Sequence, residues 1–278
     1  MVETISFIIL TWNSEKYLPR CLESVTGKCK EEGIDYEIII IDNGSSDATC
    51  SILDAYKLDL PDQVHLIYLD SNRGTTYTRN LGLKKAKGQY ICILDSDTEF
   101  DQGSLKEVLR ILALNEQIGI IAPRLLLPDG SIQNSVKRFP TFWHKIMKIP
   151  KILFGTRIAD ADFYKTFPFE EEVFVDSAIS ACWFLRRELL EDVGLLDESI
   201  FYSPEDLDYC FRVREKGKGI LYSPYFTILH HTQQISHKRP FSKVSLSHFA
   251  GLLYYYRKHG GWISSPALKN VFDMRVDE

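Results

Sequence analysis

The chain has 278 residues, of which 45% are hydrophobic and 26% are charged, and its formal net charge is −5 at pH 7. This composition is typical of a globular protein with a sizeable core, and the mildly negative charge argues against a nucleic-acid partner bound through a basic surface. No apolar run is long enough to span a bilayer, and the first residues do not resemble a signal peptide, so we expect a cytoplasmic protein.

The six cysteines contain no Cys-x-x-Cys pair. Cys92 falls inside an apolar run and Cys21 falls on the apolar face of a predicted helix. These positions are typical of buried free thiols in a reducing compartment, and they argue against a disulfide framework or a zinc site.

Four apolar runs rich in β-branched residues predict buried strands with helices between them. The runs cover residues 6–10, 37–41, 64–69 and 90–94. Each run ends in a polar turn that contains Asn, Asp or Gly, which are residues that favour turns. Strands that alternate with helices in this way predict an α/β fold with a mostly parallel sheet and right-handed crossovers.

The carboxyl ends of parallel strands meet at one edge of a sheet, where ligands bind in such folds. The polar residues expected along this edge are Thr11, Asn13, Asp42, Asn72, Asp95 and Asp97. We expect Asn13 or Ser14 to cap the helix after the first strand, and Ser46 or Asp47 to cap the helix after the second. The first strand is not followed by Gly-x-Gly-x-x-Gly or by a Walker lysine loop, which argues against a dinucleotide site and a P-loop.

Asp95 and Asp97 follow the fourth strand directly, and strand alternation points their side chains the same way. Two adjacent carboxylates repel each other unless a cation lies near them. Their hard oxygen atoms suit Mg²⁺ or Mn²⁺, and these ions commonly accompany a diphosphate. A solvated turn after a strand is the alternative interpretation of such a pair taken alone.

The second half of the chain begins with a predicted helix near residues 104–114 and continues with shorter strands. Residues 131–159 contain no acidic residue but hold six basic residues among aromatic ones, which predicts a surface loop, a lid or a membrane-surface segment. A helix near 205–216 carries acids in its first turn, and a strand at 226–229 leads into His230 and His231. Residues 252–259 predict an aromatic and basic helix that packs on the body or touches a membrane.

Five blocks of the sequence, in this order, resemble those of the family 2 glycosyltransferases with the GT-A fold, and the nearest branch is that of the bacterial rhamnosyltransferases. The blocks are residues 8–14, 41–47, 72–82, 94–98 and 186–230. The resemblance implies a Rossmann-like, mostly parallel central sheet flanked by helices, with a smaller antiparallel acceptor-side portion. It implies one catalytic domain over 1–278, made of a nucleotide-sugar-binding half, an acceptor and catalytic half, and a C-terminal helical tail (1–103, 104–235 and 236–278).

The resemblance also implies the roles of individual residues. Those expected to bind the donor are Thr11, Asn13, Asp42, Asn72, Arg79, Asp95, Ser96 and Asp176. Those expected to bind Mg²⁺ or Mn²⁺ are Asp97, Asp95 and His230, and the neighbouring His231 is the alternative to His230. Asp206 is expected to be the general base, with Glu205 as the alternative. The chain departs from the family at Ser180-Ala181, where relatives usually have Gly-Ala, and at the bulkier run 75–78.

The expected activity is the metal-dependent, inverting transfer of a hexose from a UDP- or dTDP-sugar to an acceptor hydroxyl. A metal stabilises the leaving nucleoside diphosphate, and a carboxylate takes the proton of the hydroxyl. The expected acceptor is a cell-surface glycan or a lipid-linked precursor, with peripheral contact to the inner face of the membrane through 137–157 and the C-terminal helix. A non-catalytic nucleotide-sugar-binding or scaffold subunit is the alternative, but it would require lesions in the acids, which are all present. A sugar nucleotidyltransferase would require a glycine-rich loop near the amino terminus, which the sequence lacks.

Overall fold

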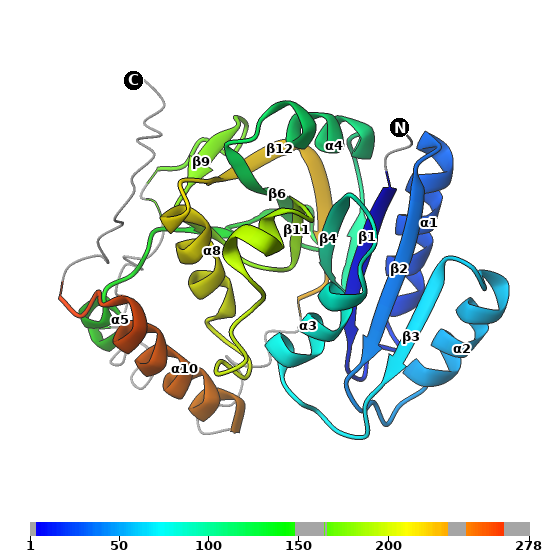
Figure 1. Cartoon of the computed structure of the whole chain (residues 1–278), viewed down its shortest axis with the longest axis horizontal. Coiled ribbons are helices and arrows are strands. Elements are labelled where there is room, and N and C mark those ends of the chain that lie inside the picture. Colours follow the sequence, from blue (N-terminus) through cyan, green and yellow to red (C-terminus); the bar gives the residue numbers. More distant parts are fainter. Residues whose placement is uncertain (1–3, 148–163, 165, 233–242, 264–278) are drawn as a thin grey trace.

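The computed structural model describes residues 4–147, 164, 166–232 and 243–263. In this part of the chain a ten-stranded sheet has the order β3-β2-β1-β4-β11-β6-β12-β5, with β7 beside β6 and β9 beside β12 (Figure 1). A separate two-stranded sheet pairs β8 with β10. Helices cover both faces of the large sheet, so the predicted α/β architecture is confirmed.

The first half of the large sheet is parallel, as the sequence predicts. Its strands are β1 (Thr4–Thr11), β2 (Asp35–Asp42), β3 (Val64–Tyr68) and β4 (Tyr90–Asp95). They are connected by α1 (Leu18–Glu32), α2 (Thr49–Asp59) and α3 (Thr75–Lys85). The register sets Thr11 opposite Asp42 and Leu10 opposite Asp95, so the carboxyl ends of β1, β2 and β4 are level with one another.

The second half of the sheet contains antiparallel pairs. Its elements are β5 (Thr98–Phe100), α4 (Leu105–Leu114), β6 (Ile118–Leu126), β7 (Ile132–Gln133), β8 (Val136–Lys137), α5 (Phe142–Met147), β9 (Val173–Val175), β10 (Ser177–Ala178), β11 (Cys182–Arg186), α7 (Leu189–Val193), α8 (Glu205–Glu215), β12 (Gly219–His230) and α10 (Lys243–His259). β11 runs antiparallel to both β4 and β6, whereas β12 runs parallel to β6 and antiparallel to β5. β12 is longer than the strand predicted at 226–229, and its last residue is His230. The pairing with β5 therefore brings the end of β12 beside the turn that follows β4.

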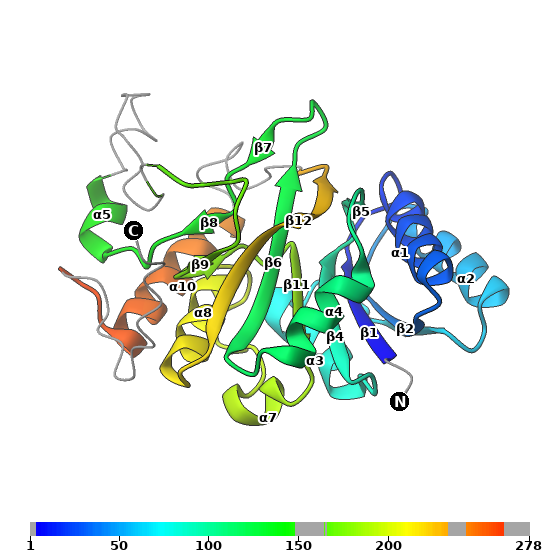
Figure 2. The same cartoon turned by 90° about the horizontal axis from the view of Figure 1, so that it is seen from above.

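Strand alternation divides the core into two layers. Phe7 and Ile9 point into a cluster with apolar residues of α1, α2 and α4. Ile8 points to the other face, into a cluster with residues of α3, α7, α8 and α10. Figure 2 shows α8 and α10 on the opposite side of β6 and β12 from α4.

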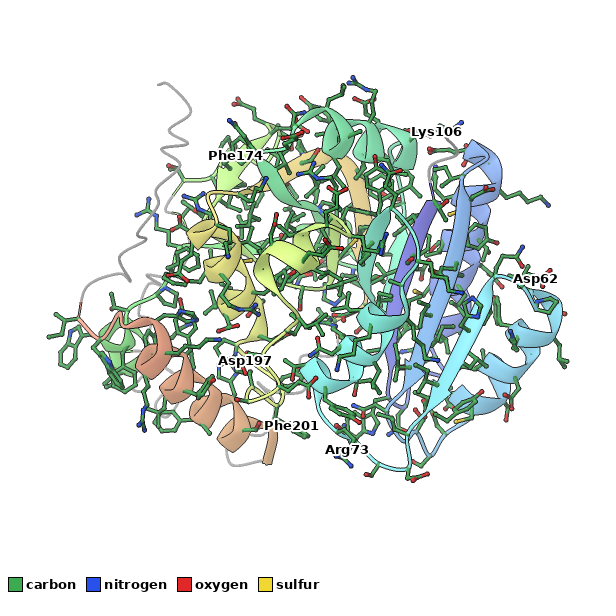
Figure 3. All side chains as sticks on the ribbon, viewed as in Figure 1. Asp62, Arg73, Lys106, Phe174, Asp197 and Phe201 are labelled. Atoms are coloured by element: carbon green, nitrogen blue, oxygen red, sulfur yellow. The ribbon has the colours of Figure 1, made fainter. Side chains whose placement is uncertain are left out.

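The loop between α7 and α8 joins the two halves of the molecule. Its residue Phe201 accepts, through its carbonyl oxygen, a hydrogen bond of 2.7 Å from the N–H of Thr75 at the start of α3. Its residue Asp197 binds Lys258 of α10, with 2.6 Å between the carboxylate and the ammonium group. Figure 3 shows Phe201 and Asp197 on this loop, next to α10 and near the start of α3. The loop thus connects α3 to the C-terminal helix.

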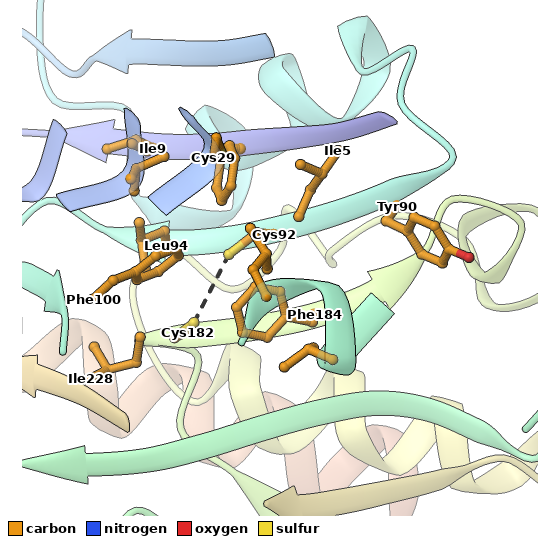
Figure 4. Packing of buried hydrophobic residues seen from close by; sticks show 14 of the residues in the cluster. Ile5, Ile9, Cys29, Tyr90, Cys92, Leu94, Phe100, Cys182, Phe184 and Ile228 are labelled. Carbon is orange, nitrogen blue, oxygen red and sulfur yellow. Dashed lines mark hydrogen bonds between the residues drawn. The ribbon is translucent and has the colours of Figure 1, made fainter. Parts of the chain in front are cut away.

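All six cysteines are free thiols, as predicted, and all except Cys50 are buried. The Sγ atoms of Cys92 in β4 and Cys182 in β11 lie 3.9 Å apart in the core between the two halves of the sheet (Figure 4). Burial raises the pKa of the Cys92 thiol well above its ordinary value, so this thiol stays protonated and behaves as an apolar group.

The predicted capping of α1 is wrong, because α1 begins at Leu18 without a side-chain cap. Asn13 has a left-handed backbone (φ 52°), and its side-chain oxygen accepts the N–H of Ser46 instead. Asn13 therefore ties the turn after β1 to the turn after β2. The predicted capping of α2 is also wrong, because Ala48 is at its N-cap position and no side chain caps it there. Asp47, one residue earlier, still accepts the N–H of Thr49, the first residue of α2, over 3.0 Å.

The C-terminal helix α10 packs on the body of the protein. Its residues Tyr255 and Tyr256 are fully buried. Asp208 of α8 has no exposed surface and accepts hydrogen bonds from Lys258 (2.7 Å) and His259 (2.8 Å). Among the helices of the described residues, none is both long and apolar enough to cross a membrane.

Candidate active site

Asp42 lies at the end of β2, and its carboxylate accepts hydrogen bonds from Thr11, from Ser45 and, over 3.7 Å, from the thiol of Cys50. The hydroxyl of Thr11, at the end of β1, donates to Asp42 Oδ1 over 3.0 Å. Ser45, in the turn after β2, donates its N–H to Oδ2 (2.9 Å) and its hydroxyl to Oδ1 (2.5 Å). The structure thus brings the predicted residues Thr11 and Asp42 together and fixes the carboxylate in one orientation. Ser45 was missed by the sequence analysis.

Asn72 stabilises the start of α3. Its side-chain oxygen accepts the N–H of Gly74 (2.9 Å) and the side-chain amide of Asn43 (3.1 Å). Gly74 has φ 85°, and a Cβ there would lie 2.3 Å from the carbonyl oxygen of Phe201. The site therefore needs glycine at this position for both its backbone conformation and its lack of a side chain.

Three predicted metal ligands, Asp95, Asp97 and His230, come together beside the end of β4. One ligand atom from each lies within 4.8 Å of the others. His230 Nε2 is 3.4 Å from Asp97 Oδ1, and His230 Nδ1 is 2.7 Å from the side-chain oxygen of Gln133. A proton on Nδ1, donated to Gln133, leaves the lone pair of Nε2 directed toward the acids. Two carboxylates and one imidazole suit Mn²⁺ or Mg²⁺, so the residues present fit a divalent cation.

The pKa of His230 reflects the same neighbours. Burial alone lowers the pKa of His230, but the hydrogen bond that His230 donates to Asp97 and the charges of Asp97 and Asp95 outweigh it and raise the pKa above its ordinary value. The site therefore favours a positive charge at this point even in the protein alone.

His231 points to a different set of partners. Its Nε2 is 2.6 Å from Glu99 Oε1, and its ring stacks on Tyr17 with the centroids 4.7 Å apart. Its backbone N–H donates to the carbonyl oxygen of Asp97 over 2.8 Å. Within the described residues, His230 and not His231 belongs to the acidic cluster.

Arg79 of α3 lies buried between two carboxylates, with 2% of its surface exposed. Its Nη2 donates to Asp95 Oδ1 over 2.5 Å, and its Nη1 is 3.3 Å from Glu205 Oε1. Nη1 also donates to the hydroxyl of Ser180 (2.7 Å), and Nη2 to the Ser180 carbonyl oxygen (3.2 Å). Arg79 thus connects β4, the segment before β11 and the start of α8.

The environment of Arg79 raises the pKa of both acids that contact it. Burial and the neighbouring Asp206 raise the pKa of Glu205 to about 7, against the opposing effect of Arg79. Burial also raises the pKa of Asp95, and Arg79 again acts in the opposite direction. At both carboxylates desolvation therefore has a larger effect on the pKa than ion pairing with Arg79. Such raised pKa values are common where catalytic groups cluster.

The structure places the remaining predicted residues at different distances from this centre. Asp206 is half-buried at the start of α8, and its carboxylate accepts the N–H of Leu207 (2.8 Å). The hydroxyl of Ser96 lies 2.8 Å from that of Ser14. Asp176 lies elsewhere: among the described residues its hydrogen bonds go to Phe139 and Tyr164, not to Arg79 or the acidic cluster.

Three functional contacts were not expected from the sequence, and they come from Ser45, Gln133 and Ser180. Ser180 carried a signal, because it departs from the Gly-Ala that the family resemblance implies at 180–181. Ser45 and Gln133 carried none, since serine in a turn and glutamine in a short strand are ordinary. Their roles follow from tertiary contacts with Asp42 and His230.

The sequence profile of "Glycosyl transferase family 2" matches residues 6–194 of the chain. This range includes Asp42, Arg79, Asp95 and Asp97 but ends before α8 and His230.

Two curated relatives illustrate the similarity. The N-acetylglucosaminyl-diphospho-decaprenol L-rhamnosyltransferase of Mycobacterium tuberculosis is 23% identical over 279 residues, which cover 96% of this chain and 88% of the relative. The succinoglycan biosynthesis protein ExoO of Rhizobium meliloti is 34% identical over 131 residues, which cover 46% of this chain and 36% of the relative. The chain therefore spans most of the first relative and about a third of the second.

Two solved structures have a similar fold. The structure of GalNAc-T7 with UDP, GalNAc and Mn²⁺ has a TM-score of 0.68 at 17% identity, and the match covers 92% of this chain and 48% of that one. The structure of Staphylococcus aureus TarS 1–349 with UDP has a TM-score of 0.55 at 20% identity, with 81% and 60% covered. Both are GT-A glycosyltransferases, so the similarity confirms the predicted GT-A fold.

Proposed function

Because the chain belongs to glycosyl transferase family 2, we propose that it transfers a hexose from a UDP- or dTDP-sugar to an acceptor hydroxyl with inversion at the anomeric carbon. The observation that carries this proposal is the meeting of two acidic groups across Arg79. Asp95 and Asp97 come from the end of β4, and Glu205 and Asp206 come from the start of α8. A donor bound at the first pair would present its anomeric carbon to an acceptor near the second.

The donor side of the site would be formed, within 1–103, by residues at or just after the ends of β1, β2, β3 and β4 and by one residue of α3. They are Thr11, Asn13, Asp42, Asn72, Arg79, Asp95 and Ser96. Asp95, Asp97 and His230 would hold Mg²⁺ or Mn²⁺, which when bound acts as a Lewis acid toward the leaving diphosphate. The fit of these three side chains to a divalent cation supports this. The presence of UDP and Mn²⁺ in the GalNAc-T7 structure, and of UDP in the TarS structure, agrees with it.

The acceptor side, within 104–235, would use Asp206 as the general base. An acceptor hydroxyl is a weak nucleophile at neutral pH, so its proton must move to a base as attack proceeds. The carboxylate of Glu205 is already bound by Arg79 and Ser180. Among the described residues no ion pair engages Asp206, and its half-buried side chain is open to a substrate. Asp176 would contact the acceptor or the sugar only after a rearrangement of its present contacts.

Asp206→Asn tests the assignment of the base. It should lower the rate of transfer by about 10² to 10⁴-fold, because proton transfer occurs only in the transition state, and leave the affinity for the nucleoside diphosphate nearly unchanged. Transfer rates and calorimetric titrations would be compared with those of Asp192→Asn, a change at an exposed acid. Transfer at the wild-type rate by Asp206→Asn would contradict the assignment.

The proposed acceptor is a cell-surface glycan or a lipid-linked precursor on the inner face of the membrane. The names of the rhamnosyltransferase and of ExoO, which refer to a decaprenol diphosphate and to succinoglycan, support this class. Peripheral contact would use 137–157 and the C-terminal helix; residues 148–157 lie outside the described part of the chain. Two exposed tryptophans adjoin at this corner, where the N–H of Trp143 donates to the carbonyl oxygen of Trp262 over 3.2 Å.

A further inference from the structure

Ser180 contacts two members of the buried network, Arg79 and Glu205. It lies just before β11 and exposes 6% of its surface. Its hydroxyl oxygen accepts from Arg79 Nη1 (2.7 Å), and its hydroxyl hydrogen is donated to Glu205 Oε1 (3.0 Å). Its carbonyl oxygen accepts from Arg79 Nη2 (3.2 Å).

The direction of these hydrogen bonds is fixed by chemistry. Arg79 has only donors, so the single hydroxyl proton of Ser180 is left for Glu205. The next residue, Ala181, accepts the backbone N–H of Asp95 over 2.9 Å through its carbonyl oxygen. The segment 180–181 therefore contacts the carboxyl end of β4, the guanidinium of α3 and the first residue of α8 at the same time.

The direct contact between Arg79 and Glu205 is longer than either of the hydrogen bonds that connect these two side chains through Ser180. Nη1 and Oε1 are 3.3 Å apart, whereas both hydrogen bonds through the Ser180 hydroxyl are shorter. A glycine or alanine here would leave the buried Arg79 donor and the Glu205 acceptor with only this weaker contact. Unpartnered buried groups are costly, so the two side chains would shift.

We propose that Ser180 is a positioning residue of the transfer reaction: its hydroxyl holds Arg79 and Glu205 in one arrangement and so fixes the first turn of α8, which carries Asp206, against Asp95. This inference rests on the proposed function. The side chain of Ser180, which is larger than that of a glycine, completes this buried network.

The ionisation of Glu205 provides a readout of this role. The groups that face its carboxyl are Arg79 from α3, Ser180, and Asp206 and Cys210 from its own helix, with Tyr202 from the preceding loop. A hydrogen bond donated to the carboxylate favours its charged form, so loss of the Ser180 hydroxyl should raise the pKa of Glu205. One hydrogen bond to a charged group corresponds to a rise of about one pH unit.

Ser180→Ala is the test, with Ser223→Ala as the matched control. Ser223 is also buried and also donates to a glutamate, Glu172, over 2.7 Å. Ser180→Ala should lower kcat about tenfold, with the KM for the donor within about twofold, and move upward by about one unit the step of the pH profile that follows the ionisation of Glu205. Ser223→Ala should change neither kcat nor the pH profile. Ser180→Thr, which keeps the hydroxyl, should recover part of the kcat that Ser180→Ala loses.

A double variant separates positioning from a general structural effect. In a Glu205→Gln background the added change Ser180→Ala should have little further effect on kcat, because its partner no longer carries the charge. An equal loss of kcat in both backgrounds, or a pH profile of Ser180→Ala that matches the wild type, would overturn the proposal. If Ser180→Ala does not fold, Ser180→Cys replaces it in the test, because cysteine keeps the volume of the side chain but is a weak hydrogen-bond donor. The same two outcomes would then overturn the proposal.

A measurement without activity distinguishes failure of this inference from failure of the proposed function. The side-chain carboxyl of Glu205 can be titrated by ¹³C NMR in the wild type and in Ser180→Ala, and assigned through Glu205→Gln. If the wild type transfers no sugar, the proposed function fails, and the titration still decides the inference. An unchanged Glu205 titration in Ser180→Ala would overturn it, and an upward shift would support it.

Discussion

The neutral variant Glu205→Gln should change how the stability of the protein depends on pH. Glu205 lies in the buried network with Arg79 and exposes 8% of its surface. Burial, followed by the charge of Asp206, raises its pKa from the ordinary value of 4.5 to about 7. The carboxyl therefore binds its proton more tightly in the folded protein than in the unfolded chain.

The size of the effect follows from this difference. The stabilisation is fully present below pH 4.5 and is lost as the pH rises through about 7. A difference of about 2.5 units at about 1.36 kcal/mol per unit gives a loss of about 3 kcal/mol. Glutamine does not titrate, so the unfolding free energy of Glu205→Gln minus that of the wild type should rise by about 3 kcal/mol between about pH 4.5 and 7.5.

Urea denaturation at several pH values and constant ionic strength measures this difference directly. Subtracting the unfolding free energy of the wild type from that of the variant removes the contribution of every other titrating group that the substitution leaves unchanged. The weaker contact of glutamine with Arg79 adds a cost of its own, but that cost is nearly independent of pH in this range. A difference that stays constant between the two ends of the range would refute the buried, raised-pKa account of Glu205.

Two further predictions concern the packing around the site. Asp208→Asn should destabilise the protein by about 3–5 kcal/mol, because Arg212, Lys258 and His259 lose a buried charged partner. The same change should make α10 a target for limited proteolysis. An unchanged urea midpoint would contradict this prediction. Gly74→Ala should lower the melting temperature more than Gly130→Ala. Both glycines have positive φ (85° and 81°), but only the Cβ at Gly74 meets backbone; equal losses would show that the contact with the 194–204 loop does not matter.

The parallel half of the sheet was predictable because β1, β4 and the second half of β2 are buried on both faces. Such strands are continuous apolar runs that end at polar turns, so residues such as Asp42 and Asp95 mark the strand ends directly in the sequence. The expectation of a buried strand at 64–69 is wrong in part, because β3 lies at the edge of the sheet and only its first residue, Val64, is buried. Spacing alone also placed Asp95 and Asp97 on one side. The cap of α1 was predicted wrongly because Asn13 found a partner in Ser46, 33 residues away, and pairwise contacts at that separation leave no local pattern.

The contacts of the second half could be predicted only in part. A histidine pair at the end of a strand does not reveal which ring points inward. In the structure Gln133 forms a hydrogen bond with the ring of His230, and Glu99 forms one with the ring of His231. Arg79 was expected to bind the donor. Its burial between Asp95 and Glu205 depends on how α8 meets β4, a tertiary relation that no local pattern encodes.

The most direct test of the account is calorimetric titration of the protein with UDP, dTDP and GDP, each with Mn²⁺ and again with EDTA. The account predicts that a pyrimidine diphosphate, UDP or dTDP, binds in the presence of Mn²⁺ and that EDTA removes the binding, because Asp95, Asp97 and His230 are proposed to hold a divalent cation that the diphosphate would need for binding. A folded protein that binds none of the three nucleotides, or that binds one equally well in EDTA, would contradict it.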